Sequence, residues 1–170
     1  MSMSVGISLA ELLSWDQETS AFWKKHFEAN PAQLELPCDI GGSKNVQDQN
    51  VRGLLRHNWG VELRWVERLA ALPVTPREEL PEGPLDALYD MHLKAAAIFR
   101  ELLAAPDETW EQPFKIDWIP SLEQTVSRRK LAGHMLFHGQ RHWAQLSTLL
   151  RTAGLPSNFR GDLLLSQALE

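Results

Sequence analysis

The sequence contains one cysteine, no long apolar run and no excess of basic residues. Because Cys38 is alone, a disulfide framework within the chain is excluded, and the composition suits a reducing compartment. No apolar run approaches the roughly 20 residues of a transmembrane helix, and the first residues lack the basic start and apolar centre of a signal peptide. We therefore expect a cytoplasmic protein without a membrane partner.

The charge balance and the composition further narrow the class of protein to which the chain can belong. The formal net charge is −5, so the chain has no basic footprint for nucleic acid. Its 170 residues are 44% hydrophobic and 23% charged, which is typical of a soluble globular protein. This length predicts a single domain over residues 1–170. Cys38 lies in a connector rich in proline and glycine with no evident base nearby, so we do not expect it to be a nucleophile.

Four segments carry apolar residues at the spacing of amphipathic helices. We expect helices over about residues 8–29, 45–72, 85–104 and 125–153. Ser8 and Glu11 have capping-box spacing at the start of the first, and Gly154 marks the end of the last. Four such helices around one core predict an all-α four-helix bundle.

The segments between these helices are long and rich in proline. The connectors from the first helix to the second and from the third to the fourth exceed those of a minimal up-and-down bundle, so we expect longer crossover connections. Residues 105–121 carry three prolines and several aromatic residues and are predicted to form a crossover loop, with room for a short strand. After residue 154 we expect a short tail laid back on the domain.

The last predicted helix carries three histidines spaced four residues apart, His134, His138 and His142. At 100° per residue, His138 and His142 fall on its apolar side, whereas His134 lies further round. That side is defined by Leu131, Met135, Leu146 and Leu149. Two imidazoles one turn apart can reach a single ion. The pair is therefore a candidate for metal binding, with hydrogen-bonded core histidines as the alternative.

A third ligand would have to come from another helix. His57 lies on the flank of the second predicted helix, and His92 lies at the centre of the third. Glu62 stands in the middle of an apolar stripe, where a carboxylate is out of place unless it is paired or serves a site. His92 also suits a core histidine hydrogen-bonded to a neighbouring helix. The spacing of these residues leaves both histidines open as the third ligand.

Two segments resemble the DinB superfamily. The segment HMLFHGQRHWAQLSTLLRTAGLP resembles its last helix, in which a histidine, a second histidine four residues on, a glutamine or similar residue three further and a closing glycine recur. Here the first three are His138, His142 and Gln145. The segment LLRHNWGVELRWVERL resembles its second helix, where a glutamate follows a histidine by five residues, here His57 and Glu62. The resemblance covers most of the chain in layout.

This resemblance implies a metal centre made by His57, His138 and His142. The ion would be divalent, with zinc, nickel, iron and manganese all compatible, and one or more coordination positions would stay open. Homodimers are frequent in the superfamily, so a homodimer is expected. One departure is Arg141, which stands where the family often has a histidine directly before His142. Because the second of those two histidines is the ligand, the site is expected to persist.

Three neutral imidazoles leave the ion its full charge, which suits Lewis-acid chemistry on a small-molecule substrate. Related branches of the superfamily include S-transferases that use bacillithiol, mycothiol or glutathione, and a mycothiol-dependent maleylpyruvate isomerase. The leading hypothesis is therefore a metal-dependent transferase acting with a low-molecular-weight thiol. The alternatives are a metal-dependent hydrolase using metal-activated water, with Glu62 as base, and a non-catalytic metal-binding stress-response protein.

Five further residues are candidates for supporting roles. Glu62 and Gln145 are candidates for orienting a ligand histidine or the activated water. Trp59, Trp118 and Trp143 are candidates for the walls of a substrate pocket, although aromatic residues at helical spacing more often belong to the core.

Overall fold

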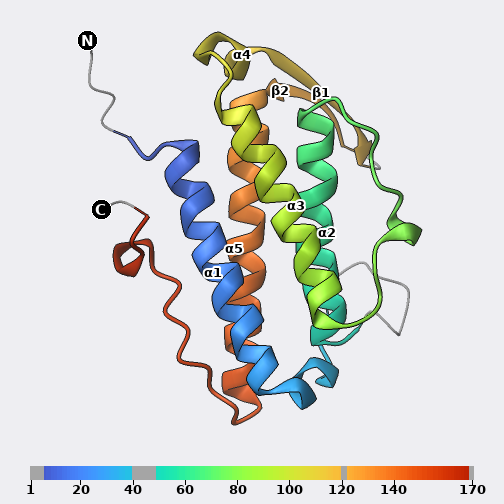
Figure 1. Ribbon diagram of the computed structural model, residues 1–170, viewed down its shortest axis with the longest axis vertical. Coiled ribbons are helices and arrows are strands. Elements are labelled where there is room, and N and C mark those ends of the chain that lie inside the picture. The colour runs from blue at the N-terminus through green and yellow to red at the C-terminus, as the bar shows by residue number, and fades with distance from the viewer. Residues whose placement is uncertain (1–5, 40–48, 120–121, 169–170) are drawn as a thin grey trace.

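The apolar stripes of four long helices pack against one another in the computed structural model, which describes residues 6–39, 49–119 and 122–168 (Figure 1). These helices are α1 (Leu9–Ala29), α2 (Val51–Leu69), α3 (Leu85–Leu103) and α5 (Arg128–Thr152). The largest fully buried side chains come from all four and include Trp23, Trp59, Phe99 and Trp143. The predicted all-α four-helix bundle is confirmed.

The order of packing is not that of an up-and-down bundle. Helices α1 and α2 each pack against both α3 and α5. Helices α2 and α3 begin at the same end of the bundle and run parallel, so residues 70–84 must return along its side (Figure 1). This connection joins the second helix to the third, whereas the longer connections were predicted from the first helix to the second and from the third to the fourth. It includes a short 3₁₀ helix, η3 (Arg77–Glu79).

Polar and close-packed contacts hold the crossover against α2. The Arg56 guanidinium donates to the backbone carbonyl groups of Arg77, Leu80 and Pro81. The side chain of Leu80 packs directly on Gly60, where an added Cβ would lie 2.7 Å from Leu80 Cδ1. A residue larger than glycine at position 60 would therefore push the crossover away from α2.

The helix ends follow local capping. Ser8 caps α1 as predicted, since the Glu11 N–H donates to Ser8 Oγ and the Ser8 N–H donates to the Glu11 carboxylate. Asn50 caps α2 by accepting from the Gly53 N–H. The predicted start of this helix at residue 45 lies outside the described residues. Its predicted end at residue 72 is too late, because α2 ends at Leu69.

The predicted loop over residues 105–121 is wrong in part. It contains a short helix, α4 (Asp107–Glu111), and strand β1 (Pro113–Ile119), which pairs antiparallel with β2 (Leu122–Ser127) over one end of the bundle (Figure 1). The predicted start of the last helix at residue 125 is also wrong. Residues 125–127 pair with β1, and Ser127 then caps α5 by accepting from the Lys130 N–H.

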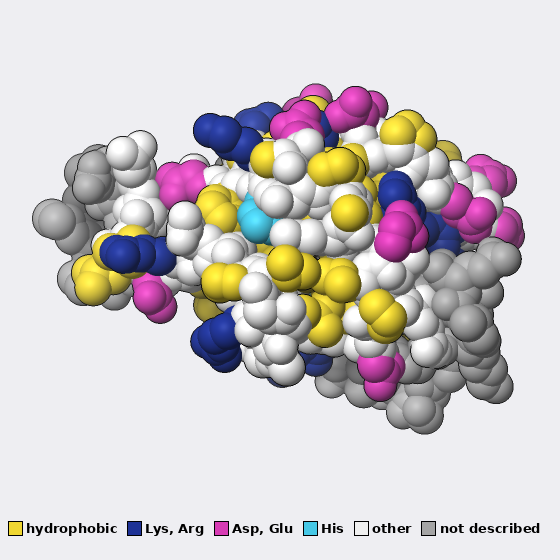
Figure 2. All heavy atoms as spheres, turned by 90° about the horizontal axis from the view of Figure 1, so that it is seen from below, with side chains coloured by type: hydrophobic (Ala, Val, Ile, Leu, Met, Phe, Trp, Pro, Cys, Tyr) yellow, Lys and Arg dark blue, Asp and Glu magenta, His cyan; other side chains and the backbone are white. Residues whose placement is uncertain are grey.

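The surface of the chain shows two further features. After Gly154, whose φ is +74°, the tail runs back along α1 (Figure 1), where Ser166 Oγ donates to the Glu18 carboxylate. On the lower face, acidic and basic side chains lie around hydrophobic ones without a continuous basic patch (Figure 2). Within the described residues, no helix combines the length and apolar character that crossing a membrane requires.

Candidate metal centre

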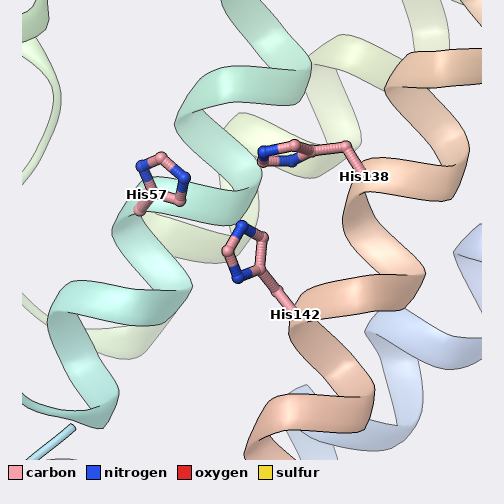
Figure 3. Close-up of side chains that lie close together, drawn as sticks. All are labelled: His57, His138 and His142. Carbon is pink, nitrogen blue, oxygen red and sulfur yellow. The ribbon is translucent and has the colours of Figure 1, made fainter. Parts of the chain in front are cut away.

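Two helices far apart in sequence bring three histidines together, His57 from α2 and His138 and His142 from α5 (Figure 3). One nitrogen of each ring faces the space between them, and the potential ligand atoms all lie within 4.8 Å of one another. The His57 ring centroid lies 5.6 Å from that of His138 and 5.0 Å from that of His142. The pair on α5 is separated by 4.6 Å. The structure thus groups the three predicted ligands, and metal binding stays a prediction.

Gln145 orients the His142 ring. The two residues are one turn apart on α5, and His142 Nδ1 donates to Gln145 Oε1 at 3.1 Å. The Gln145 amide in turn donates to the backbone carbonyl of Asp39 at 2.7 Å. With the proton on Nδ1, Nε2 of His142 carries a lone pair. The predicted orienting role of Gln145 therefore has a direct contact in support.

The residues present fit a divalent cation. His142 Nε2 is buried and has no hydrogen-bond partner among the described residues. A buried lone pair without a donor is unfavourable, and an ion between the three rings would satisfy it. Three imidazole nitrogens are a familiar donor set for zinc and other transition metals. The group contains no carboxylate from the described residues, so the ligands would leave the charge of the cation unreduced.

The protonation states also suit metal binding. Burial lowers the pKa of His138, and the neighbouring His142 and His57 rings lower it further, to about 3. Burial likewise lowers the pKa of His142. Both rings are therefore neutral at pH 7, and neutral imidazole is the form that coordinates a metal.

A second group of ionisable side chains lies deeper in the bundle. It consists of Asp16 from α1, Glu62 from α2 and His92 from α3, all of them buried. His92 Nδ1 donates to Glu62 Oε2 at 2.9 Å and lies 3.8 Å from Asp16 Oδ2. Burial alone would lower the pKa of His92, but the Glu62 carboxylate raises it to about 9. Burial raises the pKa of Asp16 well above its ordinary value. A protonated His92 therefore offsets the negative charge of this group.

The structure shows which of His57 and His92 lies beside the histidine pair on α5, a choice that the spacing left open. His57, and not His92, joins the pair on α5. His57 and Glu62 are five residues apart on α2, about 140° around a helix, so their side chains leave the helix in different directions. Glu62, predicted as an orienting residue or base, accepts its hydrogen bond from His92.

The three candidate tryptophans lie in two different places. Trp59 and Trp143 are buried in the core, where their ring centroids are 5.8 Å apart and Trp59 Nε1 donates to Ser20 Oγ. Trp118 lies on β1, under the Arg68 guanidinium at 4.6 Å. Of the three, Trp118 is the one placed outside the central core.

Two residues that contact these groups, Asp16 and Trp65, were not among the predicted site residues. Asp16 was not singled out, although an aspartate one turn after Leu12 in an apolar stripe is the same kind of signal that Glu62 gave. Trp65 lies on the second predicted helix. In the structure it is half-buried, and its ring stacks on His134 at 5.1 Å and lies 6.5 Å from the His138 ring. Only the packing of α2 on α5 reveals that contact.

Known proteins resemble the chain in sequence pattern and in fold. A family model described as the DinB family matches residues 1–160. Among solved structures, the chain is similar to YfiT from Bacillus subtilis, described as a probable metal-dependent hydrolase with an unusual four-helix bundle topology. The TM-score is 0.61 at 18% identity, covering 91% of this chain and 94% of YfiT. At 18% identity, the similarity between this chain and YfiT is one of fold alone. No curated protein matches the chain.

Proposed function

Because the chain belongs to the DinB family, we propose that it is a metal-dependent enzyme in which His57, His138 and His142 hold a divalent ion. Its reaction is the attack of a low-molecular-weight thiol on a small electrophile: a C–S bond forms, the bond from that carbon to a leaving group such as chloride breaks, and the thiol proton passes to solvent. The observation that carries this proposal is the convergence of three imidazoles, the pair on α5 being neutral, with no carboxylate from the described residues in the group. A bound divalent ion supplies Lewis-acid chemistry, which lowers the pKa of a thiol or water placed beside it.

The position of Glu62 supports a thiol nucleophile over water. A thiol has a pKa of about 8.5 and is largely deprotonated after a modest shift. Water is a far weaker acid, with a pKa of about 15.7, and its attack benefits from a general base. The carboxylate proposed as that base accepts instead from buried His92, in the second group. A bound ion would make both nucleophiles available, but a thiol needs the smaller shift in pKa and no carboxylate base, and none of the described residues adds a carboxylate to the three histidines.

Hydrolysis is the second candidate. It is supported by the likeness to YfiT, which is described as a probable metal-dependent hydrolase. The identity of the ion, zinc, nickel, iron or manganese, and the formation of a homodimer stay predictions.

The test is an activity and metal assay on protein purified without a histidine tag. We expect about one divalent ion per chain. We also expect conjugation of 1-chloro-2,4-dinitrobenzene with bacillithiol, mycothiol or glutathione to be faster than the uncatalysed reaction. His57→Ala and His138→Ala should each lose both the ion and the activity. His92→Ala should keep the ion, and His26→Ala, on α1, is a matched control outside both groups.

Each outcome has a distinct meaning. Ion loss in His92→Ala with retention in His57→Ala would reassign the third ligand. Turnover of ester or amide substrates that is indifferent to thiols would replace transfer by hydrolysis. Stoichiometric metal without turnover of either kind would favour a non-catalytic metal-binding protein.

A further inference from the structure

A small hollow lies between α2, the start of α5 and the β1–β2 hairpin. Figure 1 shows that the hairpin covers this end of the bundle. Its volume is about 110 Å³. The apolar wall comes from all three elements and consists of Trp65, Ile116, Ile119, Val126 and Leu131. Ile116 and Leu131 are buried, whereas Gln124 and Lys130 stand exposed at the edge. The lining is therefore mainly apolar, with Gln124, Lys130 and His134 as its polar members.

The hollow adjoins the metal centre through stacked rings. Trp65 forms part of its wall and stacks on His134, with centroids 5.1 Å apart and planes at 25°. The same indole lies 6.5 Å from the His138 ring, at 27°. His134 also lines the hollow, and its centroid is 6.1 Å from that of His138. A molecule in the hollow would thus touch residues that directly contact a predicted metal ligand.

The shape and chemistry of the hollow favour one class of occupant. An apolar cavity of roughly 150 Å³ holds benzene, so an open hollow of about 110 Å³ suits one ring with its substituent directed outward. Ile116, Ile119, Val126 and Leu131 offer no side-chain hydrogen bonds, which disfavours a polar occupant.

We propose that this hollow binds the aromatic or branched alkyl group of the electrophilic substrate, and thereby sets substrate preference. The proposal rests on the transferase function proposed above. The substituent that carries the reacting atom would pass the Trp65–His134 stack toward the three histidines. The substrates would then be small electrophiles with one apolar group, such as benzyl or isobutyl derivatives.

Binding to the metal-free protein tests the hollow without any requirement for activity. The probe is 4-fluorotoluene, followed by ¹⁹F NMR. We expect saturable binding that weakens at least about tenfold in Val126→Trp, where the indole fills the space on a strand that tolerates aromatic residues. Leu93→Trp adds the same side chain at an exposed position on α3 and should bind like the wild type. Equal affinity in Val126→Trp and the wild type would overturn the proposal.

A second variant guards against misfolding of the first. Ile119→Ala removes apolar volume from a half-buried wall position and should tighten binding of the bulkier 4-fluorocumene relative to 4-fluorotoluene. An unchanged ratio of the two affinities would contradict the proposal.

The kinetic test separates this inference from the proposed function. In the metal-loaded enzyme, Val126→Trp should raise KM for benzyl chloride about tenfold and leave KM for the thiol unchanged. Probe binding at the hollow without thiol transfer would leave the hollow in place and remove the transferase function. Thiol transfer with no saturable probe binding would keep the transferase function and rule out the hollow as a binding site.

Discussion

At the scale of single residues, the three site histidines are held to different degrees. His142 is buried and linked through Gln145 to the backbone of Asp39, so one ring nitrogen is hydrogen-bonded and the other has no hydrogen-bond partner in the part of the chain that the structure describes. His138 is half-buried among other rings, and no hydrogen bond explains its orientation within the described residues. Of these two rings, the orientation of His142 therefore depends on a residue that is not itself a predicted ligand, Gln145.

Replacing Gln145 tests that dependence. Gln145→Ala should weaken metal binding about 10- to 100-fold, because the His142 ring loses the acceptor that fixes its tautomer and direction. Competition with a chromophoric chelator measures the affinity. Gln140→Ala is a control on the same helix, where the amide contacts Thr19 instead. Equal affinities for the two variants would show that Gln145 does not position the ligand.

At the scale of elements, α2 serves two sites. One side carries His57 toward α5, and another carries Glu62 toward Asp16 on α1 and His92 on α3. Close approach of α5 also matters here, since a Cβ on Gly139 would lie 3.1 Å from Asp16 Oδ1. The second group, Asp16, Glu62 and His92, thus links α1, α2 and α3 next to Gly139, where α5 has no side chain.

The pH dependence of stability should report this buried group. The pKa of His92 is raised to about 9 in the folded chain. Its contribution is therefore fully present below about pH 6.5 and is lost as the pH rises through 9. The raised pKa of Asp16 acts in the same direction. We expect the free energy of unfolding to fall by on the order of 2 kcal/mol between pH 7 and 10.

Urea denaturation followed by circular dichroism at pH 6, 8 and 10 measures that change. His92→Gln should be less stable at pH 7 and should lose most of the slope, whereas His26→Gln should keep it. A wild-type slope that survives in His92→Gln would assign the pH dependence to other groups.

At the scale of the whole molecule, the candidate centre bridges α2 and α5, which lie side by side in the bundle (Figure 1). The ligands come from helices separated by the crossover, α3 and the hairpin. An ion held there would bind the folded chain and not the unfolded one, so metal binding and global stability must be linked.

Calorimetry of chelated and reloaded protein tests the linkage. At a free metal concentration 100 times Kd, the stabilisation is about 2.7 kcal/mol. For a chain of this size that raises Tm by roughly 5–10 °C. His138→Ala should show no such rise. A rise of the same size in that variant would place the stabilising ion elsewhere.

Local patterns determined much of this protein. The helical periods, the Ser8 cap and the pair of histidines one turn apart on α5 depend on neighbours within a few residues, so they could be predicted from the chain alone. The third ligand could be named only by resemblance, because the spacing of His57 and His92 suits a ligand in both cases. The hairpin was largely missed, since residues 105–127 combine prolines with aromatic residues and their strands are defined by pairing with each other.

Tertiary structure alone decided which side chains meet. Whether Glu62 faces the three histidines or His92 depends on how α2 is rotated against α3 and α5, and that rotation follows from the fit of all four helices. The same fit brings Trp65 against His134 and opens the hollow beside the candidate metal centre. Periodicity places a residue on a helix face, but only the packing of the other helices determines what that face touches.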